Sequence, residues 1–109
     1  MHSSPPPLIL ITNDDGIASP GLRAAVQAAL TLGEVRVAAP SHPSSGAGRS
    51  LPIVPIAGPV PYPLEVDGRT VAAYHLDASP ALVVLYALRD LKREQRRPAL
   101  LISGINYGE

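Results

Sequence analysis

The sequence contains no cysteine, no phenylalanine and no tryptophan among its 109 residues. The lack of cysteine excludes disulfides, cysteine-ligated zinc sites and thiol nucleophiles, and it fits a reducing compartment, so we expect a cytoplasmic protein. The lack of Phe and Trp means that the core must be built from Leu, Ile, Val and Ala. Nine basic residues balance nine acidic ones. No broad charge is therefore present to attract a nucleic acid polymer or an anionic membrane.

The sequence also lacks the signals that direct a protein to a membrane. Its first residues, Met-His-Ser-Ser-Pro-Pro-Pro, have neither the basic start nor the apolar run of a secretion signal. No apolar stretch is long enough to span a bilayer. The length suits one domain. We therefore expect a disordered tail over residues 1–7 and a single domain over residues 8–109.

Apolar runs and helix caps predict the fold. Three short apolar runs are typical of strands buried on both faces of a parallel sheet, and they span residues 8–12, 35–39 and 99–103. Ser19-Pro20 and Ser79-Pro80 each supply an N-cap and a first-turn proline, and Gly33 is placed to cap the end of the first helix. The order of strand, helix and strand predicts a right-handed βαβ unit. The chain as a whole is predicted to form a doubly wound, mainly parallel, three-layer α/β sheet of the Rossmann-like class.

Turn residues and prolines predict the remaining segments. Five prolines from Pro52 to Pro63 exclude a helix and leave an extended edge or an irregular excursion. Asp67-Gly68 is the turn of a small hairpin, to which His75 is also assigned. The second helix ends in a basic cluster, for which a solvated helix end is favoured over a nucleic-acid patch. This cluster consists of Lys92, Arg93, Arg96 and Arg97.

Side chains that carry oxygen follow each predicted strand, where ligands bind in such sheets. They are Asn13, Asp14 and Asp15, then Ser41, Ser44 and Ser45, then Ser103 and Asn106. Two adjacent carboxylates in one crevice repel each other unless a cation lies between them, and oxygen ligands select a hard ion such as Mg²⁺ or Mn²⁺. Taken alone, however, Asp-Asp-Gly favours an ordinary turn with one capping and one solvated aspartate.

The loop from Ser44 to Ser50 carries a second, weaker signal. Its glycines and serines can present successive backbone N–H groups to an anion, with Arg49 available to a phosphate. A surface loop without a ligand is the alternative. His42, next to this loop, is either a proton carrier or, as we favour, an exposed loop histidine.

Five sequence blocks in a fixed order resemble the SurE family. They are Ile-Leu-Ile-Thr-Asn-Asp-Asp-Gly-Ile, Ser-Pro-Gly-Leu, Val-Ala-Ala-Pro, Ser-Gly-Ala and Leu-Ile-Ser-Gly-Ile-Asn-Tyr-Gly, and the resemblance covers residues 8–108. The resemblance implies one divalent metal ion, Mg²⁺ or Mn²⁺, held by Asp14, Asp15, Ser45 and Asn106. It implies hydrolysis of nucleoside 5′-monophosphates to nucleoside and phosphate, the activity of a 5′-nucleotidase and phosphoric monoester hydrolase. Family members are typically homo-oligomers.

The same resemblance implies catalytic and substrate-binding roles for other residues. Asp14 would be catalytic as well as a ligand, and either its carboxylate or a metal-bound hydroxide would be the attacking group. Asn13 would lie beside the phosphate, and Gly46 would let the loop backbone approach it. A dinucleotide-binding Rossmann domain fits poorly, because the first strand leads into Asp-Asp-Gly and not into a glycine-rich turn.

The sequence departs from the family pattern at three places. Ser41-His42-Pro43-Ser44 replaces a charged stretch with an arginine, and Leu82 occupies a position that is often aspartate. The chain also stops at Glu109, just after the predicted metal ligand Asn106. We therefore expect the amino-terminal part of the fold, truncated after its third core strand and with that strand exposed as a sheet edge. The alternative function is a weak or inactive fragment that retains metal or nucleotide binding or associates with a full-length homologue.

Overall fold

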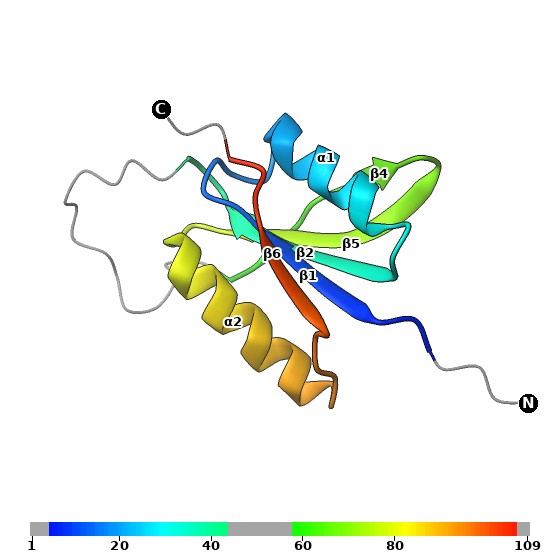
Figure 1. Cartoon of the computed structure of the whole chain (residues 1–109). Helices are drawn as coiled ribbons and strands as arrows, with labels where there is room; N and C mark the ends of the chain where they lie inside the picture. Colours follow the sequence, from blue (N-terminus) through cyan, green and yellow to red (C-terminus); the bar gives the residue numbers. More distant parts are fainter. Residues whose placement is uncertain (1–4, 44–57, 107–109) are drawn as a thin grey trace, which may run out of the picture.

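The computed structural model describes residues 5–43 and 58–106 and places them in one α/β fold (Figure 1). The elements in chain order are β1 (Leu8–Thr12), α1 (Pro20–Ala29), β2 (Glu34–Pro40), β3 (Val60–Pro61), β4 (Leu64–Val66), β5 (Arg69–Leu76), α2 (Pro80–Arg93) and β6 (Leu100–Ser103). No helix in the described ranges is long and apolar enough to cross a membrane.

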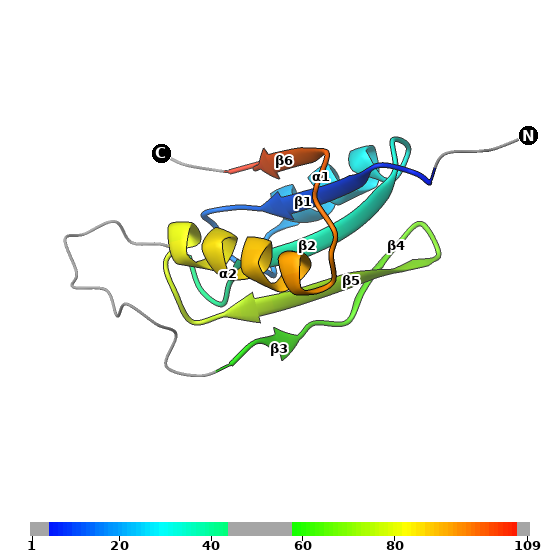
Figure 2. The same ribbon diagram turned by 90° about the horizontal axis from the view of Figure 1, so that it is seen from below.

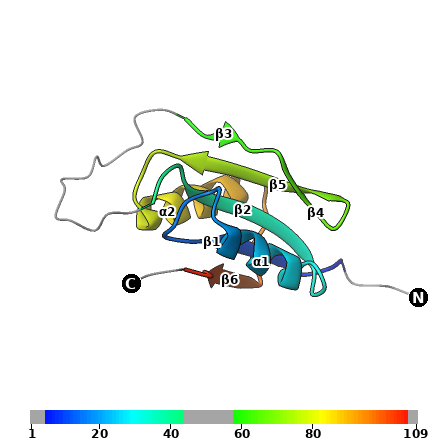
Figure 3. The ribbon, with the colours of Figure 1, turned by 90° about the horizontal axis from the view of Figure 1, so that it is seen from above.

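The strands form a mainly parallel sheet in the order β3-β5-β2-β1-β6, with β4 paired to β5 beside this path. β5, β2, β1 and β6 are parallel, whereas β3 and β4 run antiparallel to β5 (Figure 2). The two helices cover opposite faces (Figure 3). Ile9 and Ile11 of β1 pack on the α1 face, and Leu8 and Leu10 pack on the α2 face. The predicted three-layer α/β class is thereby confirmed.

Both helices begin where the Ser-Pro pairs predict. The Ser19 side chain accepts a hydrogen bond from the Leu22 N–H at 3.3 Å, and the Ser79 side chain accepts one from the Leu82 N–H at 3.2 Å. Each cap satisfies one of the backbone donors that a helix leaves unpaired at its start. In each helix proline occupies the first helical position, where its missing N–H removes nothing.

Gly33 does not cap α1, so that prediction is wrong. The cap is Leu30, and its N–H bonds to carbonyl groups within the helix. Gly33 instead allows the backbone of Pro7 to pass close to its own backbone, because a Cβ atom on Gly33 would overlap the carbonyl oxygen of Pro7. That carbonyl accepts a hydrogen bond from the Glu34 N–H at 2.9 Å. Pro7, the last residue of the expected tail, therefore contacts the fold, and the division into a tail over residues 1–7 and a domain over residues 8–109 stays a prediction.

The predicted hairpin forms, but its second strand extends into the core of the sheet. Asp67 and Gly68 both have positive φ, at 54° and 75°, as a two-residue hairpin turn requires. β5 then continues to Leu76 and pairs in parallel with β2, with His75 beside Ala39. β6 was expected to be the third core strand, and this extra pairing makes it the fourth parallel strand along the chain.

β6 forms one edge of the sheet. Leu100, Leu101 and Ile105 are 46%, 45% and 52% exposed. An edge strand with open backbone groups and apolar side chains favours pairing with another strand. The exposed edge expected from the sequence is thus present in the described residues.

Candidate active site

The side chain of Asn13 holds the loop after β1 in its turn through two hydrogen bonds to Gly16. The side chain of Asn13 is fully buried, its Nδ2 donates to the carbonyl oxygen of Gly16 at 3.0 Å, and its Oδ1 accepts from the Gly16 N–H at 3.2 Å. Gly16 has a φ of 101°, and a Cβ atom there would lie 3.3 Å from the backbone of His42. In this loop Asp14 is exposed and Asp15 is half-buried.

A second loop, after β6, is joined to the first. The Oδ1 atom of Asn106 accepts a hydrogen bond from the Asp14 N–H at 2.9 Å, across 92 positions of sequence. The Gly104 N–H donates to the Thr12 carbonyl at 2.9 Å, and the Ile105 N–H donates to the Gly21 carbonyl at 3.3 Å. These bonds hold the side-chain amide of Asn106 at the backbone of Asp14, the neighbour of Asp15 in sequence.

Two of the four predicted metal ligands, Asp14 and Asn106, are thus joined by a hydrogen bond, and Asp15 follows Asp14 directly; the chemistry of the three side chains fits a hard cation. Asp14 and Asp15 supply carboxylates, and Asn106 supplies an amide oxygen that keeps a second lone pair after accepting from Asp14. The described ranges contain no group of three or more His, Asp or Glu side chains that could hold a metal. A site with two carboxylates and further neutral oxygens is what Mg²⁺ accepts, since this ion keeps several of its waters.

The remaining predicted residues have different outcomes. Ser45, Gly46 and Arg49 lie outside the described residues. Asn13 shapes the loop, and its predicted place beside a phosphate stays a prediction. Ser103 is exposed at the end of β6.

A family model described as "Survival protein SurE" matches residues 9–109. This chain belongs to the SurE family. A "5′-nucleotidase SurE" of Methanopyrus kandleri is 49% identical over 102 residues, which are 93% of this chain and 36% of that protein. A protein of the same name from Thermococcus kodakarensis is 43% identical over 93% of this chain and 36% of its own length. The crystal structure of a SurE protein from Aquifex aeolicus superposes with a TM-score of 0.68 at 35% identity, covering 94% of this chain and 39% of that one.

These figures also measure how much of a SurE protein the chain represents. It spans between a third and two fifths of the length of these relatives. The β1 loop and the Asn106 loop both lie within the matched residues. The family match therefore includes the part of the fold that carries the three described metal-ligand candidates.

Ser41 begins the segment in which this chain departs from the SurE pattern, and it makes a contact that the sequence did not predict. The hydroxyl of Ser41 lies 2.7 Å from Nδ1 of His75, and the Ser41 N–H donates to the Leu76 carbonyl at 2.8 Å. The two side chains are 34 positions apart. They are brought together by the pairing of β5 with β2, on the side of the sheet where the parallel strands end, which we call the carboxyl edge. His42, in contrast, is exposed, as expected for a loop histidine.

The basic cluster at the end of α2 is partly neutralised. Arg96 donates through both terminal nitrogens to the carboxylate of Glu34, at 2.9 and 2.7 Å. Arg36 of β2 makes the same two-point contact with Glu94, at 2.9 and 2.7 Å. The hydrogen bonds from these arginines hold the pKa of Glu34 and of Glu94 below the usual glutamate range. These contacts connect the end of α2 to β2 on the side of the sheet where the parallel strands begin, which we call the amino edge.

Proposed function

We propose that this chain carries the metal-binding part of a phosphomonoesterase that hydrolyses nucleoside 5′-monophosphates, a 5′-nucleotidase. The observation that carries the proposal is the 2.9 Å hydrogen bond from the Asp14 N–H to Asn106 Oδ1, which joins two distant loops into one oxygen-rich site. The names of the curated relatives support it, since they are called 5′-nucleotidases.

The metal proposed here is one Mg²⁺ or Mn²⁺ ion held by Asp14, Asp15 and Asn106, with Ser45 as a fourth ligand. When bound, such an ion would polarise a phosphate oxygen and neutralise charge that develops during hydrolysis. Asn13 holds the loop in shape, and Asp14 would orient or accept the proton of the attacking group.

The substrate-binding residues form a separate part of the proposal. Gly46 would let the loop backbone approach the phosphate, and Arg49 would pair with it. Asn13, in the loop that carries Asp14 and Asp15, would lie beside the phosphate. The proposed partners are a small-molecule substrate and further copies of the chain, with no nucleic acid polymer and no membrane, in the cytoplasm.

A second candidate function is a non-catalytic module that retains metal or nucleotide binding or associates with a full-length homologue. Leu100, Leu101 and Ile105 are exposed in the described residues, and a strand from a full-length homologue would cover them in the associating form of this candidate.

The test measures phosphate released from a nucleoside 5′-monophosphate with Mn²⁺ or Mg²⁺, and with chelator. Asp14→Asn should reduce release by at least about 100-fold, more than is usual for a residue outside the ligand set. Asp67→Asn is the matched control, because it makes the same chemical change in the hairpin turn, where asparagine tolerates the positive φ of 54°.

Calorimetric titration with the metal separates the two candidates. Metal binding without phosphate release favours the non-catalytic module. Release that persists in chelator, or that Asp14→Asn leaves unchanged, would contradict the proposed hydrolase.

A further inference from the structure

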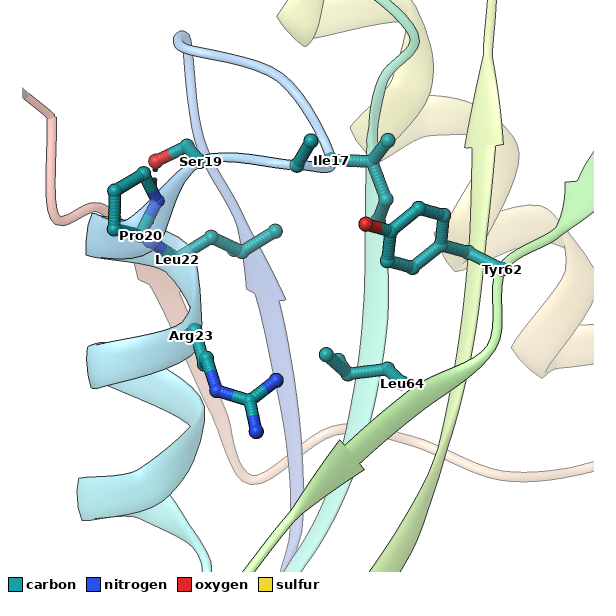
Figure 4. A pocket seen from close by; sticks show the side chains of 8 residues that line it. Ile17, Ser19, Pro20, Leu22, Arg23, Tyr62 and Leu64 are labelled. Carbon is teal, nitrogen blue, oxygen red and sulfur yellow. Dashed lines mark hydrogen bonds between the residues drawn. The ribbon is translucent and has the colours of Figure 1, made fainter.

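A pocket of about 200 Å³ opens between the first turn of α1 and the segment that links β3 to β4 (Figure 4). Ile17, Leu22 and Leu64 line it with buried apolar side chains, at 6%, 1% and 5% exposure. Tyr62 and Arg23 line its more open part, and Arg23 projects from α1 toward Leu64 (Figure 4). The pocket thus combines an apolar floor with one aromatic ring and one cation.

The pocket lies next to the candidate active site. Ile17 follows Asp15 by two positions, so the chain places their Cα atoms no more than about 7 Å apart. The Ile17 N–H donates to the carbonyl oxygen of Pro40 at 2.9 Å, which fixes this part of the loop to the end of β2. Ile17 therefore places one wall of the pocket within a short distance of the backbone of Asp15.

Contacts with β5 fix the position of the Tyr62 ring. Its backbone N–H donates to the Ala73 carbonyl at 3.0 Å, and its ring makes a T-shaped contact with His75, with centroids 6.2 Å apart and planes at 79°. His75 is in turn bonded to Ser41. A ring whose position is set by its neighbours loses little freedom when a ligand stacks on it.

These groups match a flat heteroaromatic ring. The face of Tyr62 can stack on such a ring, the guanidinium of Arg23 can lie over it or donate to its nitrogen and oxygen atoms, and the apolar floor excludes water from its edge. An aliphatic alcohol would use none of these contacts except the floor.

We propose that this pocket binds the base of the nucleotide, while the phosphate lies at the loop that carries Asp14 and Asp15. This inference rests on the proposed function and specifies which part of the substrate the α1 face recognises. The aromatic ring of another phosphate ester would have similar stacking chemistry, so the experiment must separate the two sources.

The test is a titration of the isotope-labelled chain with adenosine in the presence of chelator, followed by two-dimensional NMR. A nucleoside has no phosphate, so the readout needs neither metal nor hydrolysis. We expect shifts of the amide signals of Ile17, Arg23 and Tyr62, and no such shifts with ribose 5-phosphate. Tyr62→Leu should weaken adenosine binding by at least about fivefold, as expected for the loss of one base–aromatic stack, whereas Tyr62→Phe should keep the affinity within about twofold.

Tyr86→Leu is the matched control. Tyr86 also makes a T-shaped aromatic contact, with Tyr74, but it lies on the α2 face. Its loss should leave adenosine binding unchanged. Arg23→Ala, at an exposed position of α1, tests the same pocket if Tyr62→Leu does not fold, and it should also weaken binding.

Three outcomes would overturn the inference. They are shifts that map away from the pocket, equal adenosine affinity of the Tyr62→Leu variant, and equal binding of phenol, which would show a site for any aromatic ring. Adenosine binding at the pocket without metal-dependent phosphate release would keep the inference and remove the proposed hydrolysis. Release of phosphate without adenosine binding would do the reverse.

Discussion

The parallel strands begin at one side of the sheet, here called the amino edge, and end at the other, the carboxyl edge. These two sides are stabilised in different ways. At the amino edge, charged side chains pair with each other, as Arg96 does with Glu34 and Arg36 with Glu94. At the carboxyl edge, Asn13 and Asn106 bond to backbone groups, Ser41 lies beside the imidazole of His75, and the Asp14 side chain is exposed. The amino edge pairs four of its charged side chains with one another, whereas the carboxyl edge exposes the Asp14 carboxylate.

This difference indicates that the contacts that stabilise the fold and the contacts that shape the candidate site lie at opposite ends of the strands. Contacts at the amino edge connect β1, β2 and the end of α2, and none of them involves a predicted ligand. Contacts at the carboxyl edge shape two loops that carry three predicted ligands, Asp14, Asp15 and Asn106. Changes at the first edge should therefore alter the free energy of unfolding alone, and changes at the second should alter metal binding as well.

The largest effect is expected from Gly33→Ala at the amino edge. The added Cβ would overlap the carbonyl oxygen of Pro7, which bonds to the Glu34 N–H. Relief requires a shift of the first residues of β1 or β2, and overpacking of this kind costs about 2–3 kcal/mol of unfolding free energy. Urea denaturation followed by circular dichroism measures it.

Gly58→Ala is the control for that change. A Cβ at Gly58 meets no atom within 4 Å, so its unfolding free energy should change by less than about 0.5 kcal/mol. If Gly33→Ala is also tolerated, the close approach at the amino edge contributes nothing to stability and the comparison fails there.

Asn13→Ala should have the next largest effect, and it acts at the carboxyl edge. The change removes two hydrogen bonds and leaves the buried N–H and carbonyl of Gly16 without them, which costs about 1–2 kcal/mol. Because the loop carries Asp14 and Asp15, affinity for Mn²⁺ should fall too, by roughly tenfold or more. Calorimetric titration on variants that remain folded measures it.

Gly33→Ala is the comparison variant for that second readout. It should keep its Mn²⁺ affinity under conditions where it is folded, although it is the less stable of the two. Equal losses of affinity in both variants would show that the two edges are not separate.

Local signals allowed much of the fold to be predicted from the sequence. The hydroxyls of Ser19 and Ser79 act within three residues of themselves, and Asp67-Gly68 makes its own turn, so each prediction depends on neighbours in sequence. The pairing of β5 with β2 has no such local signal, because it joins Ala39 to a residue far along the chain. The same holds for Gly33, whose role depends on where Pro7 lies.

The candidate site was predictable in position but not in its contacts. Because the carboxyl ends of parallel strands meet at one edge, Asp14 and Asn106 were expected near each other. Their hydrogen bond depends on the conformation of both loops, which no spacing encodes. His75 was assigned to the hairpin, and its contact with Ser41 follows only from the sheet register. The roles of Ser45 and Arg49 stay predictions.

The smallest effect is expected from the ion pairs. The hydrogen bond from Arg96 lowers the pKa of Glu34 in the folded protein. A carboxyl with a lowered folded pKa stabilises the fold at pH values above its unfolded pKa of about 4.3, and this contribution is lost as the pH falls through the folded pKa. Glu34→Gln should therefore flatten the decline of stability below about pH 4.3 and change little else, since exposed pairs contribute weakly.

Urea midpoints measured across this pH range test the sign, with Glu65→Gln as the matched change on the exposed face of β4. Added salt should reduce the difference between wild type and Glu34→Gln at neutral pH, because exposed charges are screened. Mn²⁺ affinity at neutral pH should be the same in all three proteins. A Glu34→Gln variant that loses metal affinity would connect the amino edge to the site, and the separation of the two edges would then be wrong.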